Sequence, residues 1–168
     1  MIVFDASTLI LLAKADLLDI VLHDYPGDIT IPQAVEAECV VLPSRTDARL
    51  IQERIREHRI AVASVQDTAV VRRLIMDFHL GRGEAEAIVL ALENHAHTVA
   101  TDDRNAIRAC KLLRLRFMTA IGMLIHSAAK GLLREDEARR SLERLASYGR
   151  YQREILEDAR RRLEGEDR

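Results

Sequence analysis

The sequence is poor in cysteine and lacks long apolar runs. Only Cys39 and Cys110 occur in 168 residues, which is too few for a disulfide framework or a structural zinc site. The longest apolar run near the N-terminus covers residues 9–13, and charged residues flank it at Asp5 and Lys14. That run is too short for a signal peptide or a membrane-spanning helix. We therefore expect a soluble protein of the reducing cytoplasm, without a membrane partner.

A large excess of charge of one sign is also missing. The chain has 25 Lys and Arg against 27 Asp and Glu, a formal net charge of -2. This balance argues against the uniformly basic surface of a non-specific nucleic-acid coat. Only Lys14, Lys111 and Lys130 are lysines, so 22 basic residues are arginines. The guanidinium fork of arginine matches phosphate or carboxylate, which is a hint about partners.

Short apolar runs alternate with patterns of helical period. Strands are predicted at residues 1–4, 29–31, 59–65, 97–100 and 116–118. Helices are predicted at residues 6–17, 32–42, 47–58, 67–79, 84–93, 104–113 and 121–129, with Gly81 to Gly83 as a helix end and restart. This order implies an α/β domain with a central, mostly parallel sheet.

The composition changes after Gly131 to Glu, Arg, Leu and Ala. Residues 135–162 are predicted to form one or two appended helices, so residues 131–168 are a helical extension of the domain at residues 1–130. We expect this extension to act in association, because its apolar side chains exceed what the α/β core needs. These side chains are Leu142, Leu145, Ile155, Leu156 and Leu163.

Acidic residues follow two of the predicted strands. Asp5 ends the first strand, and Asp102 and Asp103 follow the strand at residues 97–100. Ligands of open parallel sheets bind outside the carboxyl ends of the strands. Glu38 lies on the flank of an apolar helix stripe and can border the same edge.

Glu84 and Glu86 are two residues apart on one predicted helix, so only one of them can face a common pocket. Gathering several carboxylates costs free energy, because like charges about 4 Å apart repel by about 4 kcal/mol at an effective dielectric constant of 20. A divalent cation removes that cost. Oxygen ligands favour Mg²⁺ or Mn²⁺, and such sites activate water for attack on a phosphodiester.

Each acid also has a purely structural interpretation. Asp102 or Asp103 can cap a helix, Glu84 can respond to the helix dipole, and Asp5 can accept backbone N–H bonds at a strand end. Their joint position favours the metal hypothesis. A phosphatase with Asp5 as covalent nucleophile is disfavoured, because Ser7 stands where a second acid is wanted.

Four segments resemble the PIN-domain family in order and spacing, most closely the VapC-like toxins of prokaryotic toxin–antitoxin pairs. They are residues 2–7 (IVFDAS), 31–38 (IPQAVEAE), 81–88 (GRGEAEAI) and 101–104 (TDDR). The resemblance extends from Met1 to about Lys130. It implies a three-layer α/β/α fold and a Mg²⁺- or Mn²⁺-dependent ribonuclease.

The resemblance also implies roles for individual residues. Asp5, Glu38, Glu86 and Asp103 match the acids of the family, and Ser7 matches its supporting hydroxyl residue. We assign the catalytic role to these four acids, metal binding to Asp5, Glu86, Asp103 and Asp102, support to Ser7, Thr101 and Glu84, and phosphate contacts to Arg82 and Arg104. The doubled acids leave the register of the third and fourth ligands open.

The prediction is a metal-dependent ribonuclease that acts on RNA, with a protein antitoxin and a second copy of the chain as partners. The alternative is a catalytically inactive PIN-like module that binds RNA or protein, because folds persist after activity is lost.

Overall fold

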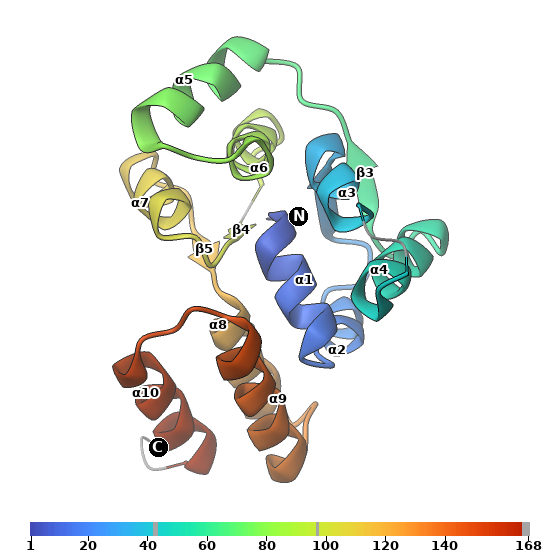
Figure 1. Ribbon diagram of the computed structural model, residues 1–168, viewed down its shortest axis with the longest axis vertical. Helices are drawn as coiled ribbons and strands as arrows, with labels where there is room; N and C mark the ends of the chain where they lie inside the picture. The colour runs from blue at the N-terminus through green and yellow to red at the C-terminus, as the bar shows by residue number, and fades with distance from the viewer. Residues whose placement is uncertain (42–43, 97, 166–168) are drawn as a thin grey trace.

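A computed structural model describes residues 1–41, 44–96 and 98–165 (Figure 1). Its centre is a five-stranded sheet in the order β3-β2-β1-β4-β5, and all strand pairs among these residues are parallel. The strands are β1 (Ile2–Phe4), β2 (Ile29–Pro32), β3 (Ala61–Ala63), β4 (Thr98–Ala100) and β5 (Phe117–Met118). The predicted parallel sheet is confirmed.

Ten helices surround the sheet within the described residues. They are α1 (Ala6–Lys14), α2 (Leu18–Asp24), α3 (Gln33–Cys39), α4 (Thr46–Arg56), α5 (Thr68–Phe78), α6 (Arg82–Glu93), α7 (Arg104–Leu112), α8 (Ala120–Ala129), α9 (Glu135–Tyr148) and α10 (Arg153–Glu164). Two positions used in the sequence prediction, Leu42 and His97, lie outside the described residues.

The sheet separates two apolar cores, because alternate residues of a strand point to opposite faces. Ile2 and Phe4 pack into one core with α1, α2, α8 and α9. Val3 packs into the other core with α5, α6 and α7. Figure 1 shows these helix groups on the two sides of the strands. The result is the expected three-layer α/β/α arrangement.

Several helix boundaries differ from the sequence prediction. The first predicted helix, residues 6–17, ends at Lys14, because Asp16 has a positive φ of 58°, and the short helix α2 that follows was not predicted. A short polar side chain tolerates this left-handed conformation better than most residues. The predicted interruption at Gly81 to Gly83 is wrong in its position: Gly81 is the N-cap of α6, and Gly83 lies inside its first turn.

The two C-terminal helices are part of the main core. Leu142 and Leu145 of α9 are buried against the core that includes α1 and α8, and the Ser141 hydroxyl donates to the Ala15 carbonyl at 2.9 Å. Leu156 and Leu163 of α10 are partly buried there too. Because these side chains complete the core, the expectation that Leu142 and Leu145 are surplus apolar surface is wrong.

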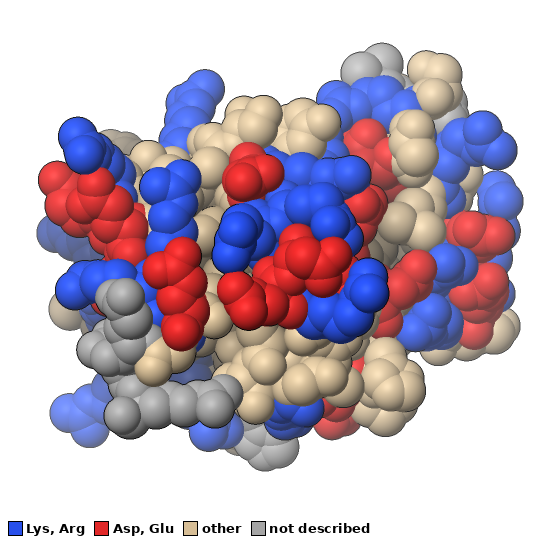
Figure 2. Space-filling model, turned by 90° about the horizontal axis from the view of Figure 1, so that it is seen from below, with Lys and Arg blue, Asp and Glu red and all other residues tan. Residues whose placement is uncertain are grey.

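The outer surface of α9 and α10 carries both signs of charge. Arg139 pairs with Glu135 at 3.0 Å and Arg140 with Asp136 at 2.9 Å, each one helical turn apart. Figure 2 shows basic and acidic side chains mixed on the face seen from the end of the molecule with α9 and α10. In the described part of the chain, no helix has the length and apolar character needed to cross a bilayer.

The position of Leu145 gives a stability prediction. Leu145→Ala should lower the free energy of unfolding by about 2–5 kcal/mol, because it opens a cavity in the core. Ile155→Ala on α10 is the control, since Ile155 is 45% exposed and its loss should cost about 0.5 kcal/mol or less. Urea denaturation measures both. Equally small losses would mean that α9 is an appendage and not part of the core.

Candidate functional site

The sheet reverses its winding direction at β1, which creates a crevice at the carboxyl edge of the strands. The chain passes from β1 to β2 on one side, whereas β4 pairs with β1 on the other. Asp5 follows β1, and its backbone N–H donates to the Ala100 carbonyl at the end of β4 at 3.1 Å. Ligands of open α/β sheets bind at such switch points. The structure therefore brings Asp5 next to Thr101 and the two acids that follow it.

The Asp5 carboxylate is buried, with 1% of the residue exposed. Its Oδ1 accepts bonds from the Thr8 amide at 2.8 Å and the Ser7 hydroxyl at 3.1 Å, so Asp5 caps α1. Burial raises its pKa to about 6, although the Thr101 hydroxyl and the Thr8 donors lower the pKa in part. No hydrogen bond of normal geometry reaches Oδ2 from the described residues. One oxygen is thus structural, and the other is left for a ligand.

The Asp102 carboxylate binds three donors from distant parts of the chain. Its Oδ2 accepts from the Thr8 hydroxyl at 2.9 Å and the Ala120 amide at 3.0 Å. Its Oδ1 accepts from the Tyr151 hydroxyl at 2.7 Å. Burial and the charge of Asp102 raise the pKa of Tyr151, which therefore stays protonated as a donor. Asp102 is a brace between β4, α1, α8 and the segment between α9 and α10.

Asp103 and Thr101 form the start of α7. Asp103 is the N-cap of the helix, and its Oδ1 accepts from the Ala106 amide at 2.8 Å. The amide of Asp103 donates to the Thr101 hydroxyl at 3.2 Å, and Thr101 is fully buried. The carboxylate of Asp103 thus has fewer hydrogen-bond partners than that of Asp102.

Glu38 and Glu84 approach each other from α3 and α6. A Cβ atom at Gly83 would lie 2.6 Å from Glu38 Oε1, so the glycine allows the close approach of this carboxylate. Loss of solvent raises the pKa of Glu38, and nearby Glu86 raises it further. Burial likewise raises the pKa of Glu84, with contributions from Asp103 and Glu38. Glu84 also accepts from the Gly81 amide in a capping box.

Glu86 is the most buried of the glutamates at this edge, with 7% of the residue exposed. Its carboxylate accepts from Arg82 Nε at 2.7 Å and from the Ala34 amide at 3.3 Å. It therefore points toward the start of α3, whereas Glu84 points toward Asp103. Arg82 is largely exposed and paired with Glu86, and Arg104 is exposed at the first turn of α7.

We call these six residues, Asp5, Glu38, Glu84, Glu86, Asp102 and Asp103, the acidic edge. Within residues 1–41, 44–96 and 98–165, no three acidic, His or Cys side chains are arranged closely enough to hold a metal ion. The carboxylates bind local N–H and O–H donors or Arg82, as anions do where like charges repel. Carboxylate oxygens are the donor type that a hard divalent cation prefers, and Asp5 Oδ2 has no hydrogen-bond partner among the described residues.

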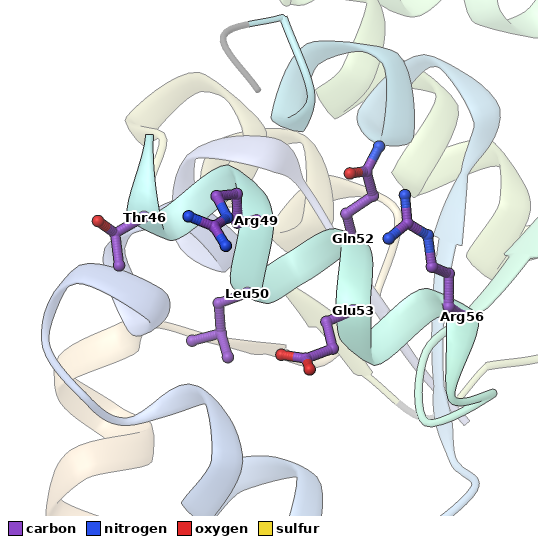
Figure 3. A pocket seen from close by; sticks show the side chains of 6 residues that line it. All are labelled: Thr46, Arg49, Leu50, Gln52, Glu53 and Arg56. Atoms are coloured by element: carbon purple, nitrogen blue, oxygen red, sulfur yellow. The ribbon is translucent and has the colours of Figure 1, made fainter. Parts of the chain in front are cut away.

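An open groove of about 760 Å³ adjoins the acidic edge. Its walls include Ser7, Lys14, Glu84, Asp103 and Arg104, together with Tyr148, Gly149 and Arg150 of the C-terminal segment. Another hollow lies along α4, where Arg49, Glu53 and Arg56 project from a single helix (Figure 3). The α4 hollow has no side chain of the acidic edge, so the groove is the better candidate for chemistry.

Several residues at the site were missed from the sequence. Thr8 and Tyr151 hold Asp102, and Lys14, Tyr148 and Arg150 line the groove. A signal for the C-terminal residues was present: the turn residues Tyr148 and Gly149 lie close to Tyr151, and the chain has three tyrosines in all. Their contact with the acids depends on tertiary packing across nearly 50 residues of sequence.

The raised pKa of Asp5 gives a prediction with a defined sign. Its folded-state pKa of about 6 exceeds the ordinary aspartate value of 3.8, so the folded chain binds more protons than the unfolded chain between these values. Wild-type stability should fall as the pH rises through this window and stay reduced above it. In EDTA at about pH 7, Asp5→Asn should raise the free energy of unfolding by up to about 3 kcal/mol.

The Asp5→Asn effect should disappear below about pH 4, as measured by urea denaturation at several pH values. Asp67→Asn is the matched control, because Asp67 caps α5 through the Val70 amide at 3.0 Å but is exposed. It should leave stability nearly unchanged. An Asp5→Asn protein that is less stable at every pH would identify Asp5 as a structural acceptor only.

The two neighbouring aspartates should respond differently to substitution. Asp102→Ala leaves three donors without an acceptor and should cost at least about 1–3 kcal/mol. Asp103→Asn should be close to neutral, because asparagine is an equally good N-cap. Chemical denaturation of both proteins in EDTA measures the difference. The reverse order would contradict the brace formed by Asp102.

The comparisons with known proteins agree with this architecture. A family model described as "DUF3368: PIN domain" matches residues 1–165. Comparison with curated proteins and with solved structures gives no match. PIN domains have a nuclease-type fold and typically use divalent metal ions. Since the match covers nearly the whole sequence, the chain belongs to the PIN-domain family.

Proposed function

We propose that this protein is a ribonuclease that hydrolyses RNA phosphodiester bonds with a Mg²⁺ or Mn²⁺ ion bound at the acidic edge. The observation that carries the proposal is the buried Asp5 carboxylate, with Oδ2 lacking a partner among the described residues. A buried polar oxygen without a partner costs free energy, and a cation would satisfy it. Family membership supports the same reaction class.

Asp5 and Asp103 are the proposed principal ligands, because each keeps one carboxylate oxygen outside its helix cap. Glu86 is the proposed third ligand, and Glu38 orients the attacking water. Asp102, which the sequence also offers as a ligand, acts in this proposal through the brace that fixes Asp103. When bound, the ion supplies an activated water and neutralises charge that develops on the phosphate.

Other side chains have supporting roles in this proposal. The Ser7 hydroxyl holds Asp5 Oδ1, and Thr101 fixes the backbone of Asp103. Glu84 caps α6 and adds negative charge beside Asp103. Arg104 is proposed to contact phosphate from the start of α7, and Arg82, which pairs with Glu86 in this structure, is proposed as a second phosphate contact.

The toxin role is a finer proposal that rests on the resemblance to VapC-like proteins. It entails a protein antitoxin and association of two copies of the chain. Light scattering of the purified protein measures its mass in solution. Growth arrest on expression that is relieved by Asp5→Asn would support the toxin role, and unaffected growth would favour general RNA processing.

Metal dependence tests the main proposal. RNA cleavage should stop in excess EDTA and return with Mn²⁺ or Mg²⁺, and Asp5→Asn and Asp103→Asn should abolish it. Mn²⁺ should also raise the melting temperature of the wild type more than that of Asp5→Asn, because ligands that bind only the folded state stabilise it. Undiminished cleavage in EDTA would contradict a metal-dependent reaction. Metal-independent RNA binding without cleavage would favour the inactive module.

Glu86→Gln should reduce cleavage far more than Glu84→Gln. Glu86 is the more buried, so its charge acts in a less polar medium. Glutamine at position 84 keeps the bond to the Gly81 amide, because Gln also serves in a capping box. Mn²⁺ titration followed by calorimetry gives an affinity for each variant. A larger loss for Glu84→Gln would make Glu84 the ligand.

A further inference from the structure

The groove beside the acidic edge has three basic side chains on its walls: Lys14, Arg104 and Arg150. None of the three forms an ion pair with a carboxylate of the described residues, unlike the paired arginines on the outside of α9. These unpaired cations lie next to a set of carboxylates. They can therefore bind an anionic ligand that extends from the basic side chains to the acidic edge. A phosphate backbone whose cleaved bond lies at the acids satisfies this condition.

Tyr148 adds an aromatic surface to the same groove. It is 54% exposed at the C-terminal end of α9, and Lys14 Nζ lies 5.0 Å from its ring centroid. A base that stacks on an exposed ring beside a cation is the usual arrangement in proteins that bind single strands. Core packing therefore does not explain this tyrosine, and its exposed ring can stack on a base.

The segment that carries Tyr148 and Arg150 is fixed in position next to the acids. The Tyr151 hydroxyl donates to Asp102 at 2.7 Å, and a Cβ atom at Gly149 would overlap the Tyr151 ring and crowd the Leu145 carbonyl. Glycine is therefore required at position 149 for this close packing. Because Tyr151 is bonded to Asp102, the neighbouring Tyr148 and Arg150 are held at a fixed position relative to Asp103.

We propose that Tyr148 and Arg150, from the end of α9 and the segment after it, are RNA-binding residues: one base of the strand stacks on Tyr148, and the adjoining phosphates contact Lys14, Arg104 and Arg150. The substrate class rests on the proposed function. A duplex is excluded from this mode, because its bases are stacked on one another and do not offer a face to Tyr148. Tyr148 is thus a binding residue for the strand that is presented to the acidic edge.

The test measures binding without cleavage. A fluorescent oligoribonucleotide of about ten nucleotides is titrated with the protein in EDTA, and anisotropy gives Kd. Tyr148→Ala should weaken binding about 5- to 150-fold, the range for loss of one stacked base, whereas Tyr148→Phe should match the wild type. Arg150→Ala should lower the slope of log Kd against log salt by about 0.7.

Arg49→Ala is the matched control for charge, because Arg49 is exposed on α4 (Figure 3), does not line the groove and has no ion pair among the described residues. It should change Kd by less than about 2-fold.

Tyr148→Ala should melt at the wild-type temperature, since Tyr148 is half exposed. Equal affinity for a duplex, equal Kd for Tyr148→Ala and the wild type, or an Arg49→Ala loss as large as that of Arg150→Ala would overturn the proposal.

Cleavage is measured separately with Mn²⁺. Binding that depends on Tyr148 without any cleavage would leave the groove in place and reject the hydrolase. Cleavage with an unchanged Kd for Tyr148→Ala would retain the hydrolase and reject the groove.

Discussion

The carboxylate of Asp102 is the interaction on which the candidate site depends. It receives donors from α1, from the first residue of α8 and from the segment after α9, which are up to 94 residues away in sequence. Hydrogen bonds to a charged group are stronger than neutral ones, and a partly buried charge is stabilised by them. The loop after β4 is therefore held against three other elements, which also fixes the position of the neighbouring Asp103.

Repulsion between carboxylates is the second constraint. Six acids meet at one edge of the sheet, and the structure accommodates them through N-caps, a capping box and the pair between Arg82 and Glu86. In Asp5 and Asp103 the helix cap engages one carboxylate oxygen, whereas both oxygens of Asp102 and of Glu86 are bonded. The burial that raises the pKa of Asp5 also leaves its Oδ2 without a hydrogen-bond partner among the described residues, and the proposed cation site rests on this oxygen. The proposed ligand binding therefore depends on a burial that lowers the stability of the metal-free chain.

Local patterns predicted most of the architecture. The alternation of short apolar runs with helical stripes correctly indicated the parallel sheet, and Asp5 and Asp103 were located at strand ends because parallel strands end at one edge. The turn at Asp16 and the helix α2 after it were missed, because no turn residue marks the position and the packing of Leu17 and α2 in the core is tertiary. The role of Leu142 and Leu145 was missed for the same reason: an amphipathic helix does not reveal which surface it covers.

The sequence by itself determined the order of strands and helices, the parallel sheet and the acidic residues at its carboxyl edge, because these follow from periodicity and chain direction. It left open which member of each doubled acid faces which neighbour. Only tertiary structure separated Asp102, with three donors, from Asp103, with a helix cap, and Glu84 from Glu86. It alone brought Tyr148 and Tyr151 to the acids, since a contact across 49 residues depends on how α9 packs on α1 and α8 and on no local pattern.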